Sequence, residues 1–129
     1  MKTSNYILFL AIYGGITGAM MLLDGKGSLE TYGVSADPYH VVIMEYLGIS
    51  NLAMAALIFF VRNEVSLKVL RIILIISAIE MLCSSLKGFY DVQISGVPGN
   101  TFFWVDAIIR FLVGLISIFI TLRISKETF

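Results

Sequence analysis

Four ionisable side chains stand inside stretches of sequence that are otherwise apolar: Glu45, Glu80, Asp106 and Arg110. A charged side chain within a lipid bilayer costs several kcal/mol unless it is paired or hydrated, so each position marks a candidate functional site. Asp106 and Arg110 stand four residues apart, the spacing at which two side chains of one helix can pair. Three carboxylates cannot all be neutralised by one guanidinium, so a carboxyl must hold a proton, or water or a cation must enter. These residue types therefore predict a polar site that holds a cation or a proton.

A purely structural interpretation is also open, because embedded ion pairs and hydrogen bonds can simply hold helices together. In that interpretation Asp106 pairs with Arg110, Glu80 pairs with Lys87, and Glu45 reaches the headgroup region. The two interpretations differ in whether negative charge remains unpaired.

The composition indicates which elements carry these residues. The 129 residues are 58% hydrophobic and 14% charged, and nine basic residues balance nine acidic ones. Soluble domains are about 45–50% apolar and about 25% charged. The departure excludes a soluble globular domain and a disordered tail, and the lack of a basic excess excludes a nucleic-acid partner. The remaining class is a small integral membrane protein whose surroundings are the lipid bilayer.

Four segments are long and apolar enough to cross a bilayer as helices, at residues 6–23, 41–61, 67–86 and 101–122. Alternation typical of barrel strands is absent. The sequence therefore predicts an all-α fold, an integral membrane four-helix transmembrane bundle forming one domain over residues 1–129. The connections at 24–40 and 87–100 carry glycine and proline and are predicted as loops, and 62–66 as a tight turn.

Lysine and arginine are unevenly distributed between the two sides of the predicted bundle. The side with both termini and the tight turn holds Lys2, Arg62, Lys68, Arg71, Arg123 and Lys126, and the other side holds Lys26 and Lys87. The positive-inside rule then places both termini in the cytoplasm of a multi-pass protein of the cell (inner) membrane. All four embedded charges fall within roughly 6–14 Å of the outer boundary, at a rise of 1.5 Å per residue.

Helical phase predicts that these charges share faces with small and polar residues. The predicted faces are Asp106, Arg110, Gly114, Ser117 and Thr121; Ser77, Glu80, Ser84 and Lys87; and Glu45, Gly48, Leu52 and Ala55, with Asn51 at the edge. If the faces turn inward together, they line an outward-facing pocket. Its predicted ligand-binding residues are Glu45, Glu80, Asp106, Arg110, Asn51, Ser84, Tyr46 and Trp104.

Two further patterns carry alternatives. Tyr46 beside Glu45 and Trp104 near Asp106 belong either to an interfacial aromatic belt or to a wall that contacts a cationic ligand through its rings. Gly14 and Gly18 form a small-xxx-small pattern, which favours close helix packing within the chain or, as the alternative, a homodimer.

Cofactor chemistry has little support in the sequence. It contains one cysteine and one histidine, and it lacks nucleotide-binding and zinc-protease motifs. No cofactor and no metal are therefore predicted, and catalytic residues stay unassigned.

The segment Leu29-Glu30-Thr31-Tyr32-Gly33-Val34, followed by Glu45-Tyr46-Leu47-Gly48, resembles the DoxX-like group of small bacterial membrane proteins. The resemblance implies four spans in about 130 residues, and some members of the group are subunits of quinone-linked oxidoreductases. It supplies no catalytic motif.

Three functions follow as hypotheses. The first is the binding of a small lipophilic or cationic molecule in the predicted pocket. The second is an accessory subunit of a membrane redox or transport complex. The third is a small membrane enzyme that uses paired carboxyls on a lipid-like substrate.

Overall fold

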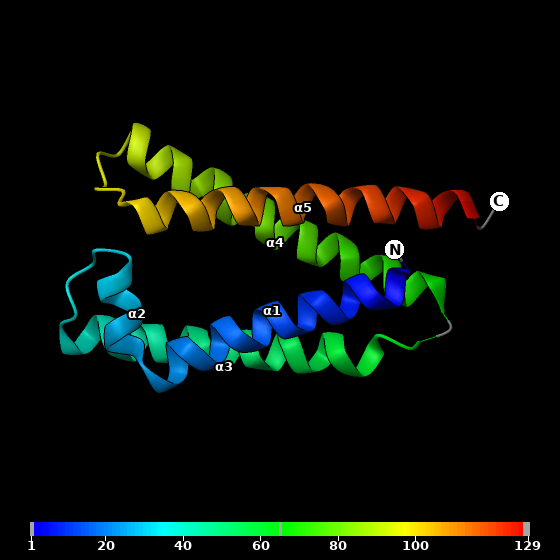
Figure 1. Ribbon diagram of the computed structural model, residues 1–129, viewed down its shortest axis with the longest axis horizontal. Helices are drawn as coiled ribbons and strands as arrows, with labels where there is room; N and C mark the ends of the chain where they lie inside the picture. Colours follow the sequence, from blue (N-terminus) through cyan, green and yellow to red (C-terminus); the bar gives the residue numbers. More distant parts are fainter. Residues whose placement is uncertain (1, 65, 128–129) are drawn as a thin grey trace. The chain divides into compact units, whose positions relative to one another are not determined.

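The computed structural model describes residues 2–64 and 66–127, with side chains as far as Ile124 (Figure 1). Within that part of the chain there are five helices and no strand: α1 (Thr3–Leu23), α2 (Gly25–Thr31), α3 (Pro38–Val61), α4 (Leu67–Gln93) and α5 (Thr101–Glu127). Val65 of the predicted tight turn and the Lys126 side chain of the predicted basic side lie outside the described residues. The all-α prediction is confirmed.

Four of the helices, α1, α3, α4 and α5, are long and apolar enough to cross a membrane. The shortest has 21 residues, which span about 30 Å at 1.5 Å per residue, the thickness of a bilayer core. The chain is therefore a multi-pass membrane protein with the four spans that its sequence predicts.

The predicted end of the third span, at residue 86, is wrong, because α4 continues to Gln93. Gly88 was expected to break the helix, yet tertiary packing keeps it helical. A Cβ on this glycine would lie 3.0 Å from the Phe103 ring of α5, so the residue allows close approach of the two helices. The connection to α5 is correspondingly shorter than predicted, and Asn100 begins that helix by accepting the Phe103 amide at 2.8 Å.

The connection after the first span is also not a plain loop, because it contains α2. Asp24 caps this helix by accepting the Gly27 amide at 2.9 Å. Gly33, with φ of +75°, ends it in a Schellman motif. In that motif the Gly33 amide donates to the Glu30 carbonyl and the Val34 amide to the Leu29 carbonyl, each at 3.0 Å.

α3 begins three residues earlier than predicted because Asp37 and Pro38 form a helix start. The Asp37 carboxylate accepts the amides of Tyr39 and His40 at 3.0 and 3.2 Å and pairs with the His40 ring. The hydrogen bond from the His40 side chain, with those from the two amides, holds the pKa of Asp37 below its ordinary value of 3.8.

Contacts divide the chain into two compact units, Met1–Asn63 (unit 1) and Glu64–Phe129 (unit 2). In unit 1, α1 and α3 pack closely on Gly18 and Gly48. A Cβ on Gly48 would lie 2.6 Å from the Leu22 nitrogen, and one on Gly18 would lie 2.9 Å from the Gly48 oxygen. The intramolecular use of the Gly14/Gly18 pattern is therefore present, while the homodimer and the single domain stay predictions.

The two long helices of unit 1 are antiparallel, and their ends on one side are tied together. The Ser4 hydroxyl, near the start of α1, donates to the Asn63 side chain just after α3 at 3.3 Å. Unit 2 is likewise an antiparallel pair, in which the later half of α4 faces the start of α5. The Ser85 hydroxyl donates to the Ala107 carbonyl at 2.7 Å across that pair.

Candidate functional site

Asp106 and Arg110 form an ion pair on α5, as their spacing predicts. The Arg110 Nε atom donates to Asp106 Oδ2 at 2.8 Å, and the two side chains are only 22% and 18% exposed. An i,i+4 pair projects from adjacent turns of one helix face, so the helix itself holds the partners together. This pair neutralises one of the three embedded carboxylates.

The rest of the predicted α5 face is buried as expected. Gly114 allows close approach by α4, because a Cβ there would lie 2.6 Å from Leu82 Cγ. Ser117 is fully buried, and the Thr121 hydroxyl donates to the Ser117 carbonyl at 2.8 Å. These residues, which follow the ion pair along α5, therefore serve helix packing.

The predicted α4 face is seen only in part. Ser77 is buried and Ser84 is half-buried, with its hydroxyl donating to the Met81 carbonyl at 3.1 Å. Glu80 and Lys87 are exposed. Around the axis of α4, the face that packs on α5 includes Ser77 and continues in the direction away from Glu80. Glu80 and Lys87 therefore lie at the surface.

Lys87 pairs with Asp91 rather than with Glu80, which corrects the structural interpretation made from the sequence. The reason is the longer α4, since the continued helix brings Asp91 to the i+4 position of Lys87. Glu80 makes no hydrogen bond or ion pair with the described residues of unit 2.

Sequence reasoning missed Ser85, the fully buried residue that joins α4 to α5 through Ala107. The signal was present in the pattern. Ala78 and Ser85 are small residues seven apart, the repeat of a packed helix seam, and both are buried.

The longer α4 also changes the expected depth of Glu80. Glu80 lies 13 residues from Leu67 and 13 residues from Gln93, which places it about 20 Å along the axis from either end of α4. The sequence estimate counted from an end at residue 86. Glu80 is therefore at the middle of its helix.

In unit 1, Glu45 is half-buried beside the start of α2. Its Cγ atom would lie 3.1 Å from a Cβ on Gly25. Within the described part of unit 1 its carboxylate makes no hydrogen bond or ion pair. Tyr46 follows it in sequence but projects about 100° around the helix and is 65% exposed.

The Asn51 side chain takes part in helix packing. Its Nδ2 atom donates to Met21 Sδ at 3.4 Å, and its Cβ would touch a Cβ on Gly18 at 3.0 Å. The residue thus belongs to the α1–α3 contact.

Trp104 belongs to an aromatic cluster in unit 2. Its ring stacks on Phe89 at 5.7 Å and meets Phe103 edge-on at 5.7 Å. Phe89 also lies 6.4 Å from the Phe111 ring. The cluster joins the later half of α4 to the start of α5.

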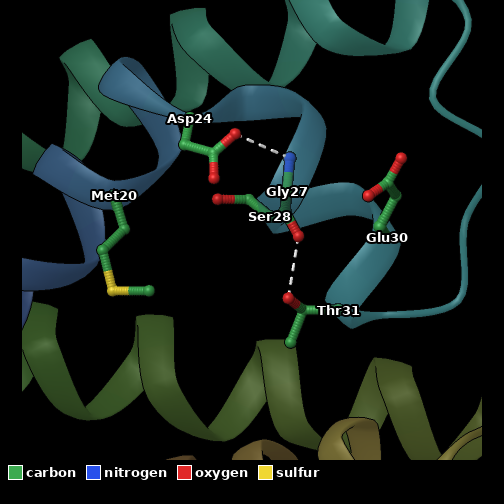
Figure 2. Close-up of a pocket in the computed structure, with 6 residues that line it drawn as sticks. All are labelled: Met20, Asp24, Gly27, Ser28, Glu30 and Thr31. Atoms are coloured by element: carbon green, nitrogen blue, oxygen red, sulfur yellow. Dashed lines mark hydrogen bonds between the residues drawn. The ribbon is translucent and has the colours of Figure 1, made fainter.

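A concavity of about 520 Å³, which the sequence did not indicate, lies where α1 ends and α2 begins (Figure 2). Its polar groups are largely engaged. Asp24 accepts the Gly27 amide, the Thr31 hydroxyl donates to the Gly27 carbonyl at 2.7 Å, and Glu30 lies 3.8 Å from Lys26. Figure 2 shows Glu30 pointing away from Met20, which lies at the opposite side of the concavity. The concavity is open, and more of its exposed surface is apolar than polar.

The predicted site residues therefore divide between the units. Unit 1 holds Glu45, Tyr46 and Asn51, and unit 2 holds Glu80, Ser84, Trp104, Asp106 and Arg110. Of these, the structure joins Asp106 to Arg110. Among the residues described, no three histidine, cysteine or acidic side chains are grouped so as to hold a metal ion.

Comparison of the chain with protein-family models, with curated proteins and with solved structures found no match. The resemblance to the DoxX-like group accordingly stays a hypothesis.

Proposed function

We propose that this membrane protein binds a small lipophilic or cationic molecule through carboxylates embedded in its spanning helices. The observation that carries the proposal is that the embedded acidic residues differ in whether their carboxylates have a partner. Asp106 is paired with Arg110, whereas Glu45 and Glu80 have no hydrogen-bonding or ionic partner among the described residues of their own units.

The physical reason is the cost of a lone carboxylate in hydrocarbon. A charged side chain near the bilayer centre costs at least about 2.5–3.5 kcal/mol unless it is compensated. A bound cation, or a donor on a ligand, removes that cost and gains a charge-assisted contact. Glu80 lies about 20 Å from either end of α4, so on this proposal its carboxylate bears the larger cost.

The test is ligand-induced thermal stabilisation of the full chain in lipid nanodiscs, with octyltrimethylammonium as the probe. We expect Glu45→Gln or Glu80→Gln to weaken the stabilisation. Glu30→Gln is the matched control, because Glu30 lies on α2, outside the spanning helices, and is exposed. Equal stabilisation of the wild type and of both variants would contradict the proposal.

We also propose that both termini face the cytoplasm of an inner membrane. Support comes from the six basic residues on the side of the termini and from the positive-inside rule. A phosphatase fused to the C-terminus should be inactive, and an active fusion would contradict this orientation.

A further inference from the structure

The start of α1 and the end of α3 form one end of unit 1 (Figure 1), and the charged side chains that unit 1 places there are basic. Lys2 directly precedes α1, and Arg62 directly follows α3. The four acidic residues of unit 1 lie at or toward its other end: Asp24, Glu30, Asp37 and Glu45. This end therefore carries two positive charges and no carboxylate from the same unit.

Arg62 is held in place, but its charge has no partner. Its Cζ atom lies 3.8 Å from the centre of the Phe59 ring, which is a cation–π contact. The guanidinium makes no ion pair or hydrogen bond with the described residues, and its Nη1 atom is buried. The nearest acid in the sequence, Glu64, accepts the Ser66 amide through its carboxylate. A buried polar group without a protein partner is one that a bound ion or ligand would satisfy.

The polar groups beside Arg62 are also hydrogen-bond donors. Lys2 makes no side-chain capping bond to α1, so the first amides of that helix, at Thr3 and Ser4, are left without a partner among the described residues. The Ser4 hydroxyl donates to Asn63 Oδ1 at 3.3 Å, which leaves the Asn63 Nδ2 group to donate. Two cations and several N–H donors match the oxygen acceptors of a phosphate group.

We propose that this end of unit 1 binds the phosphate of an anionic lipid headgroup. Position favours a lipid over free phosphate, because α1 and α3 are long enough to cross a bilayer and their ends would then lie near the headgroups. Charge favours an anionic lipid over a zwitterionic one, since a choline group would add a positive charge beside Lys2 and Arg62. Glu45 lies about 25 Å away along α3 at 1.5 Å per residue, so the inference is independent of cation binding there.

The experiment is native mass spectrometry of the full chain in a nonionic detergent. Dioleoylphosphatidylglycerol is the anionic probe, and dioleoylphosphatidylcholine is the zwitterionic counterpart. A hydrogen bond to a charged group is strong enough to change affinity about tenfold. We expect the wild type to bind phosphatidylglycerol more tightly than phosphatidylcholine, and Arg62→Gln to weaken phosphatidylglycerol binding about tenfold. Lys2→Gln, at an exposed position, should weaken it too while leaving the Phe59 contact intact.

Lys26→Gln is the matched control, because it removes the same charge from the opposite end of unit 1, where Lys26 lies 3.8 Å from Glu30. This variant should bind phosphatidylglycerol as the wild type does. Wild-type affinity in Arg62→Gln or in Lys2→Gln would overturn the inference, and so would an equal loss of affinity in Lys26→Gln.

Thermal unfolding in sodium phosphate, compared with sodium chloride of equal ionic strength, distinguishes a lipid from a free anion. The two salts should give the same Tm. A higher Tm in phosphate that is lost in Arg62→Gln, together with no preference for phosphatidylglycerol, would assign the site to free phosphate and overturn the lipid assignment.

Discussion

Gly48→Ala tests how α1 and α3 pack in unit 1. A Cβ at this position would lie 2.6 Å from the Leu22 nitrogen and 2.8 Å from the Gly18 oxygen, both backbone atoms of α1. Ordinary van der Waals contact begins near 3.4 Å, so the helices must separate by about 0.8 Å to admit one methyl group. Backbone atoms cannot move aside as a flexible side chain can.

The expected magnitude is a balance of two opposed effects. Overpacking of a tight contact costs about 1–3 kcal/mol. Alanine recovers about 1 kcal/mol over glycine through helix propensity. Gly48→Ala should therefore lower the free energy of unfolding by about 0–2 kcal/mol. Gly14→Ala is the matched control on α1, because its Cβ would meet only Ala55 Cβ at 3.6 Å. This variant makes no such close contact, so it should keep the helix-propensity gain and be more stable by about 1 kcal/mol.

The assay is unfolding of the purified chain by SDS titration in mixed micelles, with helical circular dichroism as the signal. The two alanine variants should differ by about 1–3 kcal/mol, with Gly14→Ala the more stable. Equal stability, or the reverse order, would refute the close approach of α1 and α3 at Gly48.

Three further perturbations have defined outcomes. Ser85→Ala removes the buried hydroxyl that donates to Ala107, and it should lower the free energy of unfolding by about 0.5–1.5 kcal/mol in the same SDS assay. An unchanged free energy of unfolding would contradict a stabilising role for this hydrogen bond. Arg110→Gln leaves Asp106 without this cation and should lower the free energy of unfolding by about 2–4 kcal/mol. Adding Asp106→Asn should restore part of that loss. A double variant that is no more stable than Arg110→Gln alone would contradict the pairing. Because the pKa of Asp37 is lowered by folding, its contribution to stability is present above its unfolded value of 3.8 and is lost as pH falls through the folded pKa. The Tm of Asp37→Ala should therefore lie below that of the wild type at pH 6 and approach it below pH 3.8, and a constant difference would contradict the linkage.

The four spans were predictable because their signal is cumulative. Each comes from some twenty apolar residues, so no single position decides the assignment. Helix ends depend instead on one or two residues. At Gly88 the sequence indicates a break, whereas the contact with Phe103 makes a glycine suitable within the helix. The Asp24 cap and the Gly33 Schellman turn were readable as helix signals, but the glycines between them favoured a loop.

The part of the candidate site that lies within a single helix was predictable from the sequence. The Asp106–Arg110 pair lies within one helix, so its spacing alone determines it. The partner of Lys87 depended on how far α4 continues, and the sequence assigned it to Glu80 instead of Asp91. The role of Ser85 depends on how α4 is rotated against α5, which hydrophobic periodicity defines poorly in a helix whose apolar residues are spread around its circumference.

The central claim is that embedded carboxylates bind a cationic molecule, and isothermal titration of octyltrimethylammonium into the nanodisc-embedded chain tests it most directly. The wild type and Glu30→Gln should show the same saturable binding, and Glu80→Gln should bind about tenfold more weakly. Identical dissociation constants for the wild type, Glu45→Gln and Glu80→Gln would contradict the claim.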